Sequence, residues 1–439
     1  MTRHARSARR SPQIVLMAVL ALLLTCAGAT AAALRPSGAD EALAAVPPTA
    51  GATASHPGAG ATPTPSPTPT RLPDAQFSIV AAGDVLPHGG VVADARTKGG
   101  GYDFSKLLAP MDPWIQGADL AICHMETPIA PNGKPTGYPI FGGPKQLAAA
   151  LKAQGWDGCS TASNHSVDRG FAGVKATLDA FDAVGLGHDG TARTAAEQAQ
   201  PQLYQLERAG QTITVAHVSA TYGTNGMPVD ADKPWSLNMI DVPAMVAQAK
   251  AARAAGADIV VASVHCCVEY QTSPTSQQQL IDQQLADSGE FDLVIGHHAH
   301  VPQPVVKLAG GPGGAGMWVA YGLGNYVSNQ DGDCCVASTD SGILLTAHVT
   351  SPAADPATGR PAGPARVTGV EYTPITVDRL GGHQVHALTD IPEGSTHLTA
   401  TQVSQRLARV EHAAGDAAPM RTEPETPTGP PPVVVQRAG

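Results

Sequence analysis

Six polar residues with the chemistry of metal ligands each follow an apolar or β-branched run of the sequence. They are Asp84, Glu126, Asn164, His265, His298 and His300. Carboxylate and amide oxygens, together with imidazole nitrogens, form mixed ligand sets that bind Mn, Zn or Fe. The segment 297–300 contains three histidines, and neutral imidazole is a common metal ligand. The sequence therefore predicts a divalent metal site.

The runs that precede these residues have the composition of β-strands, and helical segments lie between some of them. Strands are predicted at 77–82, 119–123, 157–161, 212–219, 258–264, 292–295 and 318–321. Helices are predicted at 145–154, 171–184, 242–255 and 276–287. Strands and helices that alternate at this spacing favour an α/β domain with much parallel sheet. Ligands of such sheets bind at the carboxyl ends of the strands, where the six polar residues fall.

Six short motifs in a fixed order resemble those of the CapA capsule-synthesis proteins, which are associated with poly-γ-glutamate and look like a branch of the calcineurin-like metallophosphoesterases. The motifs are Gly83-Asp84, Glu126-Thr127-Pro128, Ser163-Asn164-His165, His265 with Glu269-Tyr270, Gly296-His297-His298-Ala299-His300 and Tyr321-Gly322-Leu323-Gly324-Asn325-Tyr326. The resemblance spans residues 77–349. It implies a four-layer α-β-β-α sandwich, in which two sheets lie between two layers of helices.

The resemblance also implies which residues hold each of two metal ions. Asp84 and His300 would hold one ion, and Glu126 would bridge the pair. The second ion would be held by Asn164, His265 and His298. Ions bound in this way lower the pKa of a bound water and clamp the attacked group, so the implied chemistry is metal-assisted hydrolysis.

His165 would lie beside the ions as the general acid or the transition-state donor. The sequence departs from the metallophosphoesterase pattern at three positions, one of which is Glu126, where those enzymes generally carry Asp. Leu86 stands where those enzymes carry a His ligand, and His124 stands where they carry an Asn. His88 could replace the missing ligand only if its loop turns back. The sequence therefore leaves open whether one ion or two are bound.

Three further residues are candidates for contact with a substrate. Arg169 could hold an anionic group through two hydrogen bonds, or it could be a solvated residue where a helix begins. Glu269, in the segment after His265, could contact substrate or simply lie at the surface. Asn325 could line the cleft, although the glycines around it are also typical of a tight exit from a strand.

The cysteines of the folded region are even in number, which suggests disulfides in an exported chain. They are Cys123, Cys159, Cys266, Cys267, Cys334 and Cys335. Cys123 and Cys159 fall on strands that should be neighbours, and we expect them to pair, with free buried thiols as the alternative. We expect the two doublets, 266–267 and 334–335, to be joined to each other. A zinc site is the rival for the doublets, although adjacent cysteines lack the usual spacer between ligands.

The ends of the chain differ in composition from its middle. Residues 1–33 carry arginines and an apolar run, which is the layout of a secretory signal; an uncleaved anchor and a lipid on Cys26 are alternatives. Residues 34–76 are rich in Ala, Pro and Thr and predict a disordered linker. The main domain is expected at 77–380, a C-terminal extension of unassigned structure at 381–420, and a disordered Pro-rich tail at 421–439.

These observations predict an exported, surface-tethered, metal-dependent hydrolase that acts on an extracellular anionic polymer such as poly-γ-glutamate, or on a phosphoester. A non-catalytic polymer-binding or accessory subunit is the main alternative, and a cell-envelope phosphodiesterase is a third. Contact with the membrane would be made through the N-terminal anchor or lipid. The net charge of −10 argues against nucleic acid as a partner.

Overall fold

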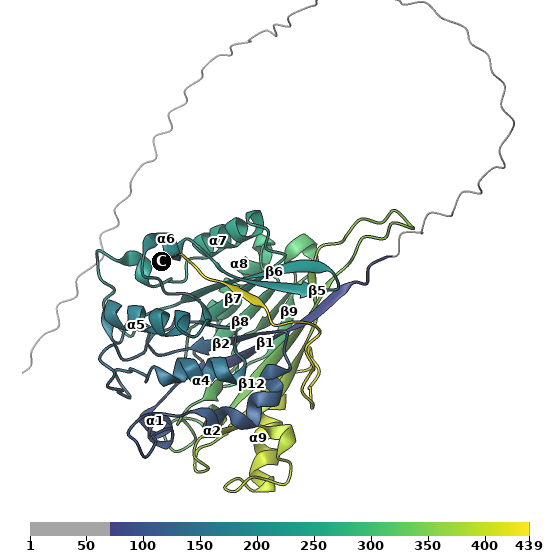
Figure 1. The fold of residues 1–439 in the computed structure, drawn as a ribbon. Coiled ribbons are helices and arrows are strands. Elements are labelled where there is room, and N and C mark those ends of the chain that lie inside the picture. The colour runs from purple at the N-terminus through teal and green to yellow at the C-terminus, as the bar shows by residue number, and fades with distance from the viewer. Residues whose placement is uncertain (1–70, 439) are drawn as a thin grey trace, which may run out of the picture. The chain divides into compact units, whose positions relative to one another are not determined.

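The computed structural model describes residues 71–438, which form two β-sheets between layers of helices (Figure 1). The first sheet has the order β14 (Gln384–Ala387), β13 (Arg366–Asp378), β12 (Ser341–Ser351), β1 (Ala75–Val85), β2 (Leu120–Met125), β3 (Gly158–Ser160) and β4 (Gly187–Asp189), and β11 (Asn325–Val327) also pairs with β1. The second sheet has the order β15 (Val433–Val435), β5 (Gln202–Arg208), β6 (Gln211–Thr221), β7 (Ile259–His265), β8 (Leu293–His297), β10 (Met317–Ala320) and β9 (Val305–Leu308).

The centre of each sheet is parallel, as the alternation of strand and helix predicts. β1 to β4 are parallel neighbours in the first sheet, and β6, β7, β8 and β10 are parallel neighbours in the second. Their register aligns the polar strand ends: Asp84 is level with His124, and His265 is level with His297. The carboxyl ends of these strands therefore present their polar residues at one edge.

Most of the helices form the two outer layers, and the last of them packs instead on the apolar cluster between the sheets. The helices are α1 (Gly89–Asp94), α2 (Ser105–Leu108), α3 (Asp112–Gln116), α4 (Gln146–Gln154), α5 (Gly170–Asp182), α6 (Ala195–Gln198), α7 (Val242–Ala254), α8 (Ser276–Ser288) and α9 (Ala400–Ala414). Leu147 of α4 and Phe181 of α5 pack on the outer face of the first sheet. Met245 of α7 and Leu285 of α8 pack on the outer face of the second. A third cluster of apolar residues fills the space between the sheets, so the four-layer α/β sandwich is confirmed.

The domain does not end near residue 380. β14 extends the first sheet, and Val403 and Val410 of α9 join the same hydrophobic cluster as the strands between the sheets. α9 begins with a capping box in which the Thr399 side chain accepts a hydrogen bond from the backbone of Gln402. Residues 381–420 therefore belong to the sandwich itself.

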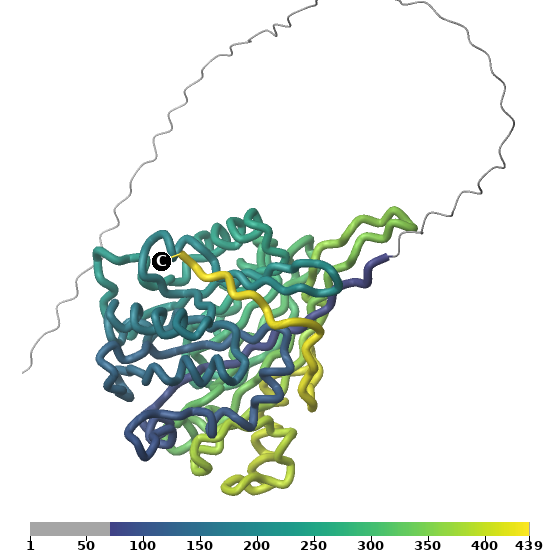
Figure 2. Tube along the Cα trace, viewed as in Figure 1, coloured from purple at the N-terminus to yellow at the C-terminus, as the bar shows by residue number. Residues whose placement is uncertain are grey.

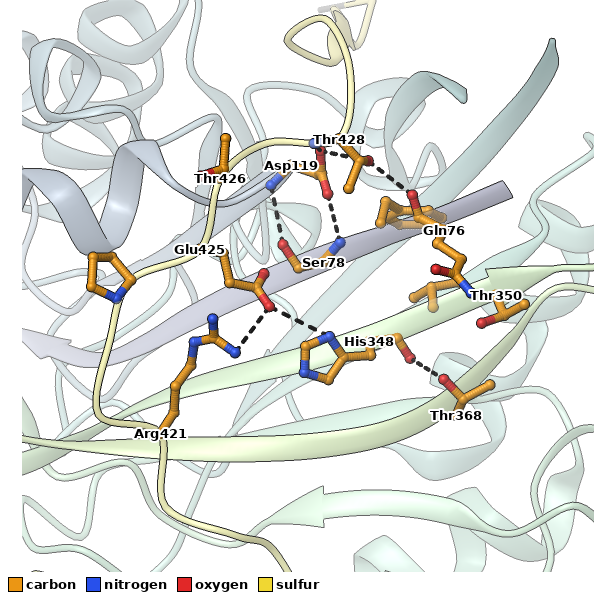
Figure 3. Close-up of a pocket in the computed structure, with 13 residues that line it drawn as sticks. Gln76, Ser78, Asp119, His348, Thr350, Thr368, Arg421, Glu425, Thr426 and Thr428 are labelled. Atoms are coloured by element: carbon orange, nitrogen blue, oxygen red, sulfur yellow. Dashed lines mark hydrogen bonds and ion pairs between the residues drawn. The ribbon is translucent and has the colours of Figure 1, made fainter. Parts of the chain in front are cut away.

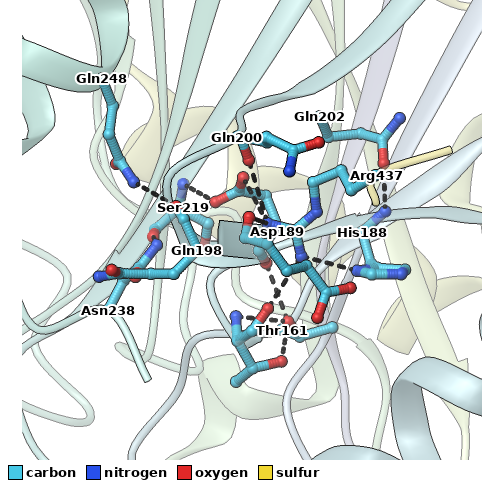
Figure 4. Close-up of polar contacts among 12 residues, drawn as sticks. Thr161, His188, Asp189, Gln198, Gln200, Gln202, Ser219, Asn238, Gln248 and Arg437 are labelled. Carbon is cyan, nitrogen blue, oxygen red and sulfur yellow. Dashed lines mark hydrogen bonds and ion pairs between the residues drawn. The ribbon is translucent and has the colours of Figure 1, made fainter. Parts of the chain in front are cut away.

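The segment 421–438 is ordered, in contrast to the disorder that its Pro content predicts (Figure 2). β15 pairs with the edge strand β5, and Thr428 donates two hydrogen bonds to Asp119. Arg437 is 7% exposed and contacts Asp189 at 3.4 Å and His188 at 2.8 Å (Figure 4). A composition rich in Pro gives no sign of these contacts, because each depends on a partner far away in the sequence.

The predicted signal or anchor at 1–33 lies outside the described residues, as does all but the last part of the linker at 34–76. β1 begins at Ala75, two residues before the predicted start of the domain. Within residues 71–438, no helix combines the length and the apolar character needed to cross a membrane.

Candidate metal centre

Strand ends from both sheets meet in one buried cluster of polar side chains. Its members are Asp84, His124, Glu126, Asn164, His265, His297, His298 and His300, each at most 3% exposed. All six predicted ligands are in this cluster. His124 and His297 are further members that were not predicted as ligands, although each falls at a strand end beside a predicted one.

Asp84, Glu126 and His300 form one group that could hold a metal ion, with ligand atoms within 4.8 Å of one another. His300 Nδ1 lies 2.9 Å from Asp84 Oδ2, and His300 Nε2 lies 3.6 Å from Glu126 Oε1. Asn325 orients this histidine, because its amide oxygen lies 3.1 Å from His300 Nδ1 and can only accept a proton. Nδ1 therefore carries a proton, and Nε2 is the nitrogen that would bind a metal, in exchange for its own proton.

Asp84, His124 and His265 form a second group of this kind. His124 Nε2 lies 2.9 Å from His265 Nδ1 and 3.8 Å from Asp84 Oδ1. His265 Nε2 lies 2.9 Å from Asn164 Oδ1, so Asn164 and His265 are neighbours as expected. His298 falls instead into a third group, with Glu269 and His300. His124, near the end of β2, thus lies next to Asp84.

The charge state of the cluster follows from its burial. Burial lowers the pKa of His124 and of His265 well below the usual value and lowers that of His298 to about 3. Burial also lowers the pKa of His300, but the charge of Glu126 and the contact with Asp84 outweigh it and raise the pKa to about 10. For Glu126, burial raises the pKa well above its usual value. Most of the imidazoles are therefore neutral, which is the form that binds metal.

The donor atoms of the cluster fit a divalent cation. Within residues 71–438, neither carboxylate oxygen of Asp84 or of Glu126 accepts a hydrogen bond of good geometry, and neither ring nitrogen of His297 has a hydrogen-bond partner, although its Nδ1 lies 3.5 Å from Asp84 Oδ1. His298 Nδ1 is likewise unpaired in the described chain. Buried polar atoms are nearly always paired, and an unpaired cluster of oxygens and nitrogens is what an ion would satisfy.

His165 lies beside the cluster and is held by a carboxylate. Its Nδ1 is 2.7 Å from Asp168 Oδ2, and Asp168 Oδ2 also accepts a hydrogen bond from the backbone of Phe141. The ring of Phe141 meets the His165 imidazole edge-on, with centroids 4.8 Å apart. On the other side of the ring, Nε2 lies 3.4 Å from the amide nitrogen of Asn225. Asn225 was not predicted, because no motif surrounds it.

A cavity of about 630 Å³ opens beside the cluster. His165, Asp168, Glu269 and His300 line it, together with aromatic and apolar side chains that include those of Tyr138, Phe141, Met227 and Tyr270. Among the described residues, none of those that line this cavity is Lys or Arg. Positive charge in the cavity would therefore come from histidine and from bound metal.

Two of the three residues predicted to contact substrate do not line this cavity, whereas Glu269 does. Arg169 immediately precedes α5, and its guanidinium donates to Thr136 Oγ1 at an exposed site. Asn325 is buried beneath His300, where its amide donates to the carbonyl of Thr339. Asn325 thus positions a histidine.

The positions of Leu86 and His88 show whether His88 replaces the histidine ligand that is absent at position 86. Leu86 is buried and lines the cavity with an apolar side chain. His88 Nδ1 lies 3.2 Å from the carbonyl oxygen of Leu86, and in residues 71–438 His88 is not part of any candidate ligand group. Any replacement for the missing ligand must therefore come from elsewhere.

The cysteine pairing agrees with one expectation and contradicts another. Cys123 and Cys159 form a disulfide between β2 and β3, as predicted. Cys266 is bonded to Cys267, and Cys334 and Cys335 are free among the described cysteines, so the predicted link between the doublets is wrong. The physical reason is that Cys266 pairs within its own loop. Even so, Cys334 and Cys335 line the same cavity as Glu269 and Tyr270, so the two loops do lie near each other.

A second cavity, of about 530 Å³, lies near the amino end of β2 (Figure 3). His348, Glu371 and Glu425 form a candidate ligand group there. Arg421 already occupies it, however, with Nη1 2.7 Å from Glu371 and 3.1 Å from Glu425. A resident guanidinium neutralises these carboxylates, so we assign no metal to this group.

Comparison with known proteins agrees with the motifs. Residues 78–330 match the model of the family described as bacterial capsule synthesis protein PGA_cap. Relatives include the capsule biosynthesis protein CapA of Bacillus anthracis, 24% identical over 236 residues (52% of this chain and 55% of that protein), and the PGA biosynthesis protein CapA of Bacillus subtilis, 29% identical over 189 residues (42% and 46%). The chain thus spans about half the length of these curated relatives.

A solved structure with a related arrangement is the calcineurin-like phosphoesterase YfkN of Bacillus subtilis. It has a TM-score of 0.42 and 14% identity over 77% of this chain and 97% of that one. The family match covers more than half of the sequence and includes the cluster described above. The chain belongs to the bacterial capsule synthesis protein PGA_cap family.

Proposed function

We propose that the protein is an exported, metal-dependent hydrolase that acts in the synthesis, release or remodelling of an extracellular polymer such as poly-γ-glutamate. Membership of the PGA_cap family supports the link to capsule polymers. The names of the two Bacillus relatives, capsule and PGA biosynthesis proteins, support it further.

The observation that carries the hydrolytic part is the set of buried, unpaired donor atoms next to a carboxylate-held histidine. Asp84 and Glu126 supply oxygens, and the surrounding histidines supply neutral nitrogens. The purely structural alternative, a buried polar network, would be expected to satisfy its own hydrogen bonds. Here the oxygens of Asp84 and Glu126 and Nδ1 of His298 have no hydrogen-bond partner within residues 71–438, whereas the ring nitrogens of His124 and His265 bond to each other, to Ser160 and to Asn164.

Asp84, Glu126, His124, His265, His298 and His300 would hold the metal. A bound divalent ion would supply an activated water and neutralise charge on the attacked group. Asp168 accepts a hydrogen bond from Nδ1 of His165 and so orients the ring, and Nε2 can carry a proton to the leaving atom at the cavity, which is an oxygen in a phosphoester and the amide nitrogen in a γ-glutamyl polymer. Within residues 71–438, the residues that line the cavity include no Lys or Arg. An anionic group of the substrate would therefore be attracted to the metal and not to a cationic side chain of the lining.

The test begins with the purified protein and a metal analysis. We expect close to stoichiometric transition metal, and hydrolysis of an aryl phosphoester or of γ-linked glutamate polymer in the presence of Mn or Zn. His165→Ala should abolish turnover but retain the metal. His412→Ala, which removes an exposed histidine on α9, is the matched control and should change neither. A protein without bound metal would contradict the proposal, and cleavage of the phosphoester alone would favour a cell-envelope phosphodiesterase.

A non-catalytic accessory subunit is the second candidate, and one observation favours it. Leu86 presents an apolar side chain to the cavity where the phosphoesterases carry a ligand. A relative from Mycobacterium tuberculosis, 26% identical over 277 residues, is named a probable polyglutamine synthesis accessory protein. Tight binding of the polymer without cleavage, in a protein that holds metal, would support this candidate over the hydrolase.

A further inference from the structure

Glu269 lies next to two histidines of the cluster although it belongs to a different loop. It follows β7 by four residues, whereas His298 and His300 follow β8. One carboxylate oxygen of Glu269 and one ring nitrogen from each histidine lie within 4.8 Å of one another. Both histidines are buried and Glu269 is partly buried, so the carboxylate faces the histidines from the cavity side.

The two loops are fastened to each other at this point. The backbone N–H of Tyr270 donates to the carbonyl oxygen of Ala299 at 2.8 Å. Tyr270, His298 and His300 have φ values of 65°, 83° and 56°, in the left-handed region that residues other than glycine rarely adopt. Such conformations persist where the surrounding structure imposes them, and they gather at functional sites. The backbone is therefore set to hold Glu269 against the histidine pair.

The donor set has the chemistry of a metal site. One carboxylate and two imidazoles are the protein ligands of known zinc and iron sites that keep a position open for water or substrate. His298 Nδ1 has no hydrogen-bond partner within the described chain, so a ring nitrogen is available. Leu86 lines the same cavity without offering a ligand atom, which leaves that side of the centre short of a donor.

We propose that Glu269 is a metal ligand, which joins His298 and His300 and supplies the donor that Leu86 does not. This inference rests on the proposed metal-dependent function. It assigns Glu269 to the centre itself and not to contact with substrate. The segment from His265 to Glu269 then contributes a ligand at each of its ends.

The experiment measures metal affinity directly. Zn²⁺ and Mn²⁺ are titrated into the metal-free full chain against a chromophoric chelator, and Co²⁺ absorption spectra report the ligand set. We expect Glu269→Gln to weaken affinity by about 100-fold, at the upper end of what loss of supporting groups costs, and to change the Co²⁺ spectrum. Glu290→Gln is the matched control, because Glu290 lies between α8 and β8, at the opposite end of that strand, and it should leave both readouts unchanged.

The outcomes separate the two proposals. If the wild-type chain binds no metal, the proposed function fails and this inference fails with it. If the wild-type chain binds metal and Glu269→Gln binds it equally well with the same spectrum, Glu269 is not a ligand and the proposed function stands. A raised KM with unchanged metal affinity would assign Glu269 to the substrate. Thermal unfolding of the metal-free variant, expected to match the wild type, shows that a loss of affinity does not reflect misfolding.

Discussion

Asp84, near the carboxyl end of β1, and Asp119, just before the amino end of the neighbouring β2, are both buried, yet their surroundings differ completely. Asp119 Oδ2 accepts the backbone N–H of Ser78, and Oδ1 accepts Arg208 Nη2 at 2.9 Å and Thr428. Asp84 is surrounded by histidines, and in the described chain neither of its oxygens accepts a well-formed hydrogen bond. The difference teaches that burial alone does not mark a site. A buried carboxylate without hydrogen-bond partners is available to bind a metal ion, whereas one whose oxygens are all paired stabilises the fold.

The largest expected effect is on metal binding. Asp84→Asn should weaken metal affinity by at least about 100-fold, because it removes a charge shared by two of the three candidate ligand groups of the cluster. Asp119→Asn makes the same chemical change near the amino end of β2 and should leave affinity unchanged. Titration of the metal-free proteins with Zn²⁺ measures both. Equal losses of Zn²⁺ affinity in the two variants would show that Asp84 has no special role in metal binding.

The next effect is on stability, and here the larger change is expected at Asp119 and not at Asp84. Asp119→Ala should lower the free energy of unfolding of the metal-free protein by about 3–5 kcal/mol, because it leaves the 3%-exposed Arg208 without its partner. Urea unfolding followed by circular dichroism gives the value. A loss below about 1 kcal/mol would show that this paired cluster does not support the fold.

A somewhat smaller loss is expected at the cluster around Arg437. Arg437→Ala should lower stability by roughly 2–3 kcal/mol, because the buried hydrogen bonds to Thr191 and His188 are lost and Asp189 is left uncompensated. Burial already raises the pKa of Asp189 to about 6 with Arg437 present. Metal content should stay at the wild-type level, and a variant that loses metal would link this cluster to the centre.

The smallest effect concerns Asp282, a buried aspartate of α8 that forms no ion pair within residues 71–438. Burial raises its pKa to about 8. Between pH 5 and pH 8 the folded protein keeps a proton that the unfolded chain has released, so stability falls as pH rises through this window. Asp282→Asn should therefore increase stability by about 1–2 kcal/mol at pH 8 and by less at pH 5. Urea unfolding at both pH values checks this, and an equal gain at both would contradict it.

Much of the site could be predicted from the sequence because its residues directly follow apolar strands. Asp84 and His265 are each the polar residue at or near the end of such a run, and parallel strands bring those ends together. The membership of His297 could not be predicted in the same way. His297, His298 and His300 are all histidines, so residue type cannot tell them apart. Where each of them lies in the cluster depends on the course of the backbone after β8.

Other features depend on contacts between distant segments, which composition does not reveal. Thr428 and Asp119 are 309 residues apart, and Arg437 and His188 are 249 apart. The Pro-rich segment therefore gives the sequence signal of disorder although its polar residues find buried partners. The cysteine doublets present a similar difficulty, because adjacent residues do not indicate which way a loop turns.

The pairing of β15 with β5 has a consequence for how the chain must assemble. Within residues 71–438, β5 pairs with β6 on one side and with residues 433–435 on the other, so it would be the edge strand of its sheet without that segment. Until that segment arrives, the second sheet offers an open edge to any extended peptide, including the same strand of another molecule. A chain cut before residue 430 would keep every residue of the metal cluster and yet be prone to self-association, so its failure in an assay would reflect solubility and not catalysis.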